Sequence, residues 1–107
     1  MNVLHFAEGD YGTGFEITCT SDQFEINDKL IFTIQNEEKT IQKEYTIDDI
    51  VSNSFVLPVI ITKEESAELT KGVYNWGIKH IRLNELQETL TIDDNKYNGI
   101  LIVEKGV

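Results

Sequence analysis

The sequence predicts an all-β fold, an antiparallel β-sandwich of about seven or eight short strands. Apolar and polar side chains alternate along several segments, the period of a strand with one buried face. Residues typical of turns separate these segments roughly every 8 to 12 residues. The single cysteine, Cys19, cannot form an internal disulfide bond, so packing alone has to join the two sheets.

The first third of the chain predicts three strands, at residues 3–7, 15–20 and 29–36. The segment 8–14 between the first two is rich in glycine, which reaches backbone angles closed to other residues and therefore favours a turn. In the third strand, Phe32 lies on the apolar side. Asp28 is counted among the acidic residues that are spread over the expected turns.

Two further strands are expected at residues 40–46 and 54–61. Charged side chains along 40–46 favour the edge of a sheet, where unpaired backbone groups need protection from association. Pro58 lacks an amide hydrogen and lies opposite the apolar row that contains Leu57, which also favours an edge or a bulge.

A short helix is predicted at residues 63–69. Thr62 and Glu65 have the spacing of a capping box, in which each side chain bonds the backbone N–H of the other residue. Gly72 is expected to end the helix in a left-handed conformation.

The strand at 73–82 contains the only tryptophan, Trp76, on the same face as His80. Strands at 86–92 and 97–104 follow, separated by a turn at 93–96. The predicted structural core consists of Phe15, Ile17, Cys19, Phe32, Leu57, Leu69, Tyr74, Trp76 and Ile78.

The length and charge of the chain limit the classes of function that it can have. The 107 residues are enough for a single domain with one core, expected to span 1–107. Nineteen acidic against nine basic residues give a net charge of −10, which repels polyanions and argues against nucleic-acid binding. The sequence indicates neither a membrane-spanning helix nor a secretory signal, so we expect synthesis in a reducing cytoplasm and no membrane insertion.

The second half of the chain carries a recognisable order of motifs. The acidic segment that precedes Leu69 leads into Leu-Thr-Lys-Gly-Val-Tyr-Asn-Trp-Gly-Ile, and the last strand begins Asn98-Gly-Ile-Leu-Ile-Val. This order resembles the immunoglobulin-like domain of baseplate upper proteins and related small tail proteins of phages that infect Gram-positive bacteria. Trp76 stands at the second aromatic position of that family's Gly-x-Tyr-x-Tyr-x-Ile pattern.

The resemblance implies a non-enzymatic structural or adaptor protein of a phage or prophage tail. Its partners would be other virion proteins, a second copy of the chain included, and its final location would be the virion tail. The alternative is a carbohydrate-binding module for a glycan of the host cell surface, with Tyr45 and Tyr97 as the stacking residues.

Catalytic and metal functions find little support in the residue patterns, and no cofactor is expected. Asp48–Asp49 and Asp93–Asp94 could supply oxygen ligands to calcium, but the twelve-residue loop pattern is missing. Cys19, His80 and an aspartate could form a nucleophilic triad, although no nucleophile motif surrounds the cysteine. A buried core thiol and solvated turns are the simpler interpretations.

Overall fold

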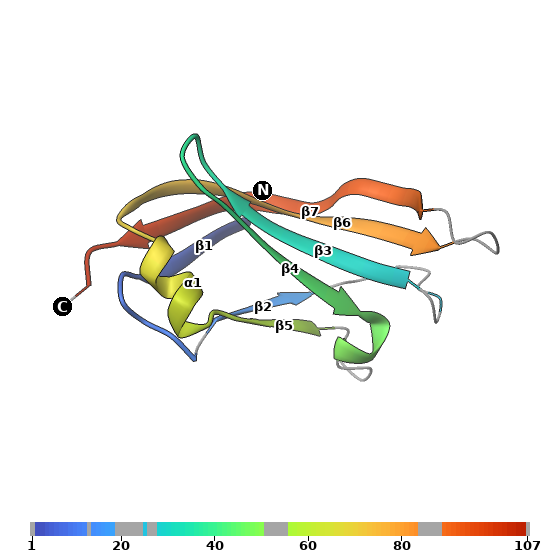
Figure 1. The fold of residues 1–107 in the computed structure, drawn as a ribbon, viewed down its shortest axis with the longest axis horizontal. Coiled ribbons are helices and arrows are strands. Elements are labelled where there is room, and N and C mark those ends of the chain that lie inside the picture. The colour runs from blue at the N-terminus through green and yellow to red at the C-terminus, as the bar shows by residue number, and fades with distance from the viewer. Residues whose placement is uncertain are drawn as a thin grey trace.

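The computed structural model describes residues 2–12, 14–18, 25, 28–50, 56–83 and 89–106. Strands dominate this part of the chain, so the predicted all-β class is confirmed (Figure 1). The elements in chain order are β1 (Asn2–Ala7), β2 (Gly14–Thr18), β3 (Asp28–Gln35), β4 (Thr40–Thr46), the 3-10 helix η1 (Ile47–Asp49), β5 (Val56–Ile60), α1 (Lys63–Glu68), β6 (Gly72–Leu83) and β7 (Thr89–Glu104).

The strands form two sheets that lie in two layers (Figure 1). The larger sheet has five strands in the order β1-β7-β6-β3-β4, and the smaller consists of β2 and β5. The charged strand β4 lies at an edge, as its side chains predicted. Pro58 lies in β5, opposite Glu16 of β2, in a two-stranded sheet where each strand has one free edge.

The expectation of a purely antiparallel fold is wrong at one edge. Strand β1 pairs with β7 in parallel, in a register that joins Val3 to Ile100 and Phe6 to Val103. The two strands come from opposite ends of the chain, and their apolar patterns contain no information on relative direction. The larger sheet is therefore mixed.

The turn predicted at residues 93–96 is also wrong, because β7 runs through this segment as one strand. The ladder between β6 and β7 shifts register on both sides of His80: Ile78 faces Tyr97, whereas His80 faces Asp93. Strand β7 thus carries extra residues that an irregularity in the ladder absorbs. Turn-forming residues occupy this irregularity, so the structure has one long strand where two were expected.

The helix prediction is confirmed at its start and corrected at its end. The hydroxyl of Thr62 accepts a hydrogen bond from the Glu65 N–H at 3.2 Å, and the Thr62 N–H donates to the Glu65 carboxylate at 2.9 Å. The same carboxylate accepts from Lys43 on β4 at 2.9 Å, which anchors α1 against the larger sheet. The helix ends at Glu68 without a left-handed cap, and Gly72 instead begins β6.

The core lies between the two layers. Trp76 exposes 3% of its surface, and its ring lies 5.9 Å from that of Phe32. On β7 the residue opposite Trp76 is Gly99, which leaves room for the indole. The predicted core residues that the structure describes are all buried, namely Phe15, Ile17, Phe32, Leu57, Leu69, Tyr74, Trp76 and Ile78. Cys19 lies outside the described residues.

Two local features fix the connection from α1 to β6 and the pairing of β2 with β5. The Tyr74 hydroxyl, at the start of β6, donates to the backbone carbonyl of Thr70 at 2.8 Å and so fixes the connection from α1. At Gly14, a Cβ atom would lie 1.7 Å from the carbonyl oxygen of Val59, so the close approach of β2 and β5 requires glycine. In the preceding turn, Gly9 and Gly12 have positive φ angles, as the glycine-rich sequence predicted.

Candidate functional site

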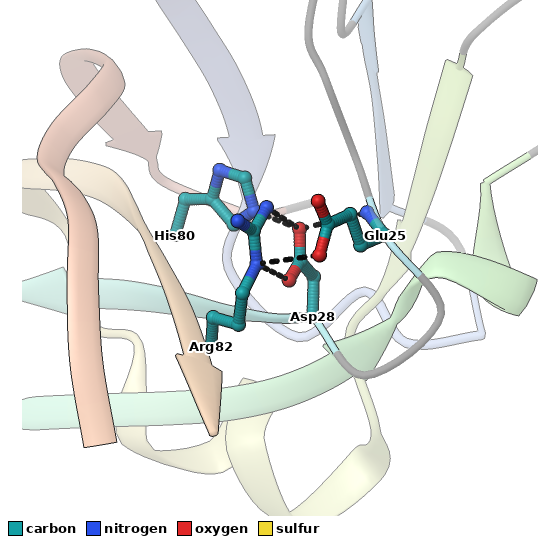
Figure 2. Close-up of polar contacts among 4 residues, drawn as sticks. All are labelled: Glu25, Asp28, His80 and Arg82. Atoms are coloured by element: carbon teal, nitrogen blue, oxygen red, sulfur yellow. Dashed lines mark hydrogen bonds and ion pairs between the residues drawn. The ribbon is translucent and has the colours of Figure 1, made fainter. Parts of the chain in front are cut away.

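A buried polar cluster joins the start of β3 to the end of β6 (Figure 2). Asp28 is a direct cross-strand neighbour of Arg82, and the side chains of Asp28 and His80 each expose only 1% of their surface. The Asp28 carboxylate accepts hydrogen bonds from Arg82 Nε at 2.6 Å and Nη2 at 2.9 Å, from His80 Nε2 at 2.6 Å and from the Glu25 N–H at 2.9 Å. Since an ionised carboxylate is only an acceptor, His80 Nε2 carries the proton of this contact.

This cluster corrects the assignment of Asp28 to a turn, because Asp28 is the buried first residue of β3. Burial alone would raise the pKa of its carboxyl group, but the hydrogen bonds from Arg82, the Glu25 backbone and His80 outweigh this and hold the pKa well below its ordinary value. The carboxylate oxygens are thus occupied by protein donors. We interpret the cluster as a structural clamp between two strands.

The structure describes only some of the residues considered for a nucleophilic triad and for calcium binding. Asp28 and His80 are in contact, whereas Cys19 lies outside the described residues. Asp49 caps η1, its carboxylate accepting from the Thr46 N–H at 2.8 Å. The side chains of Asp93 and Asp94 are not among those described. Within the described ranges, no three His, Cys, Asp or Glu residues lie close enough together to hold a metal ion.

The aromatic residues proposed as glycan contacts lie on the core side of the larger sheet. Tyr45 faces Leu30 and Tyr97 faces Ile78, and both pack against the core while Trp76 is buried within it. Strands β6 and β3 lie between the two tyrosines. They therefore do not form one exposed platform for stacking a sugar. The Tyr45 hydroxyl is buried, and this burial, together with the Glu65 carboxylate, raises its pKa to about 12.

The opposite, outer face of the five-stranded sheet is the strongest candidate for a binding surface. Among the described elements, α1 and the smaller sheet lie on the core side, and none covers the outer face (Figure 1). A groove of about 530 Å³ crosses this face over β4, β3, β6 and β7. Its size lies within the range of ligand-binding clefts.

Cross-strand register brings the lining residues of the groove together. One row across the sheet consists of Gln42, Thr33, Gly77 and Asn98, which are neighbours on successive strands. Because Gly77 has no side chain, the surface is lowest in the middle of this row. The next row contains Gln35, Asn75 and Ile100, and the row on the other side contains Ile31 and Lys79.

An apolar strip, Val3, Val73, Ile100 and Ile102, borders the groove on the side of β1. Val3 and Val73 expose 50% and 62% of their surface, and Ile100 and Ile102 are their cross-strand neighbours. Neither surface is apparent in the sequence, because the residues of the groove come from four strands and those of the strip from three. The usable signal was the strict alternation, which placed Asn75 and Gly77 opposite the Trp76 face.

Comparison of the chain with protein-family models, with curated proteins and with solved structures gives no match. The described residues contain no helix with the length and apolar character needed to cross a membrane.

Proposed function

We propose that this chain is a non-enzymatic adaptor module of a phage or prophage tail, with an immunoglobulin-like sandwich as its framework. It acts through protein–protein contacts with other virion proteins. The sequence resemblance gives the tail context, and the observation that carries the adaptor role is the apolar strip on the uncovered face of the larger sheet.

Strand connectivity supports the immunoglobulin-like framework. In such sandwiches the third, sixth and last strands of the basic set are neighbours in one sheet, and the second strand pairs with the fifth in the other. Here β3, β6 and β7 are neighbours, and β2 pairs with β5. A tyrosine near the start of the sixth strand also bonds the backbone upstream in this fold. The bond from Tyr74 to Thr70 has this form.

The apolar strip supports a contact with another protein. Two half-exposed valines and two isoleucines lie side by side on one sheet face, which supplies apolar area without the need to order a loop. The chain carries a net charge of −10, so a second copy would approach against electrostatic repulsion. The partner that fits is a different virion protein with an apolar patch and a neutral or basic rim.

Mass spectrometry of purified particles tests the tail assignment. Induction of the phage or prophage should give particles that contain this chain in a fixed ratio to the major tail proteins. If the chain occurs only in the free protein of the host lysate and never in particles, the assignment is wrong.

A pair of substitutions tests the strip. Val73→Lys should lower incorporation into particles at least about tenfold, because a charge buried in an apolar contact weakens binding by more than about 1.4 kcal/mol. Ile60→Lys is the matched control, since Ile60 is 48% exposed but lies on β5 of the other sheet. Equal incorporation of both variants would exclude the strip as the contact surface without affecting the tail assignment.

A further inference from the structure

The groove on the outer sheet face differs in charge from the rest of the molecule. Charged residues make up 26% of the chain, yet Lys79 is the one charged side chain among the described residues that line the groove. Glu44, the cross-strand neighbour of Ile31 at its margin, is neutralised by Lys29 at 2.8 Å. Acidic residues, which are common elsewhere in this chain, are therefore missing from the described lining of the groove, although Glu44 lies on the same sheet face.

Side-chain amides take the place of those charges. Gln35, Gln42, Asn75 and Asn98 surround Gly77, and Thr33 adds a hydroxyl group. Each amide presents both hydrogen-bond donors and an acceptor. A ligand that matches such a surface must itself offer donors and acceptors in alternation, and it must not require a counter-charge.

We propose that this groove binds a neutral oligosaccharide, as a segment of a cell-surface glycan chain. Sugar hydroxyl groups are both donors and acceptors, so they can pair with the amides that line the groove. Ile31 lies at the margin of the amide rows, where it can contact the C–H face of a sugar ring, whereas Ile100 on the opposite margin belongs to the apolar strip. The groove crosses four strands, so it fits a chain of sugars better than a single ring.

Charge selects this occupant over polyanions. With a net charge of −10 and Lys79 alone in the groove, a polyanionic glycan or a nucleic acid is repelled by the molecule as a whole, whereas a neutral chain is not. The described groove offers no aromatic ring for stacking, since the Trp76 side chain points into the core. Single-site binding should therefore be weak, and several copies in one assembly would raise the avidity.

Two-dimensional ¹H–¹⁵N NMR of the purified chain tests this directly, because it detects the side-chain NH₂ groups of asparagine and glutamine. Neutral trisaccharides of glucose, of N-acetylglucosamine and of galactose are added at millimolar concentration, beside their monosaccharides and an anionic oligogalacturonate. At least one neutral trisaccharide should shift the NH₂ signals of Asn75 and Gln42. Its monosaccharide should bind at least about tenfold more weakly, and the oligogalacturonate should shift none of these signals.

Two variants separate binding from folding. Gly77→Val fills the low centre of the groove at a strand position, and it should weaken binding at least about tenfold without lowering the melting temperature, because valine favours strands over glycine. Asn75→Ala combined with Gln42→Ala should weaken binding to a similar extent by removing amides. Thr18→Val on the exposed side of β2 is the matched control and should bind as the native chain does.

Three results would overturn the proposal. The first is that no neutral trisaccharide shifts the groove amides. The second is that the shifts map to the smaller sheet or persist in Gly77→Val. The third is that the same amides shift with protein concentration alone, which would indicate that a second copy covers the face. None of these results bears on whether the chain occurs in phage particles, so the two proposals fail separately.

Discussion

Replacement of Asp28 by asparagine should destabilise the fold through the polar cluster that joins β3 to β6. Asp28→Asn keeps the shape of the side chain but removes the negative charge that faces Arg82 and His80. Breaking a buried ion pair by removing one partner costs about 3 to 5 kcal/mol, because the other charge stays buried and unpaired. Arg82 retains 25% of its side-chain exposure and keeps an ion pair with the exposed Glu25 carboxylate at 3.4 Å, so we expect the lower end, about 3 kcal/mol.

That loss is large against a total stability of about 5 to 15 kcal/mol. It corresponds to a melting temperature lower by roughly 12 °C or more for a domain near 100 residues. Urea unfolding followed by the fluorescence of Trp76 measures the change. Asp10→Asn, on an exposed turn residue, is the control and should shift the midpoint little.

The same substitution should also change how the stability of the fold depends on pH in acid. The pKa of Asp28 is lowered in the folded state, so the folded carboxyl resists protonation and the native chain loses this stability as pH falls below the unfolded pKa of 3.8 towards the folded value. Asp28→Asn should flatten this part of the stability profile. The role of Asp28 as a clamp would be refuted if the unfolding free energy of the variant lay within about 0.5 kcal/mol of the native value and its dependence on pH in acid were unchanged.

Three further predictions concern the core, the contact between the paired strands β2 and β5, and alkaline pH. Trp76→Ala should lower the unfolding free energy by about 3 to 5 kcal/mol, because it opens a large cavity against Phe32. Urea titrations followed by circular dichroism measure this change, and an effect below about 1 kcal/mol would contradict the burial of Trp76. Gly14→Ala should cost roughly 1 to 3 kcal/mol by the same measurement, with Glu16→Ala as control, since its Cβ would clash with the Val59 carbonyl. The native chain should lose stability as pH rises from 10 to about 12, because only the unfolded Tyr45 ionises there; Tyr45→Phe should reduce this loss and Tyr11→Phe, at an exposed residue, should not.

Local patterns determined much of this fold, and sequence analysis could use them. The alternation along 73–82 placed Tyr74 and Trp76 on the buried face because a strand has a period of two residues regardless of its partners. The capping box of α1 was equally readable, since Thr62 and Glu65 satisfy each other within one turn. Both signals depend on residues that are close together in the chain.

Long-range pairing could not be read in the same way. The parallel direction of β1 and the ion pair of Asp28 depend on partners from the far part of the chain, and a count of acidic residues places every such residue in water. The segment 93–96 has the composition of a turn, but the β6–β7 ladder continues on both sides of it. A bulge therefore preserves more backbone hydrogen bonds than a turn would.

The candidate site was hidden for a related reason. Its amides belong to strands β3, β4, β6 and β7, and only the sheet register makes them neighbours. In the sequence alone, asparagine and glutamine look like ordinary residues of a solvated surface. What distinguishes the site is the lack of charged side chains around Gly77. That absence becomes visible only after the strands are aligned.

The two faces of the larger sheet separate stability from recognition. Trp76, Phe32 and the Asp28 cluster lie on or beside the core face, whereas the groove and the apolar strip lie on the other face of the same strands. If the proposed binding surface is correct, successive residues of one strand serve different functions, as Trp76 in the core and Gly77 in the groove illustrate. It follows that outer-face substitutions can be tested for binding in a chain that still folds, and that a core substitution which abolishes binding says nothing about the contact surface.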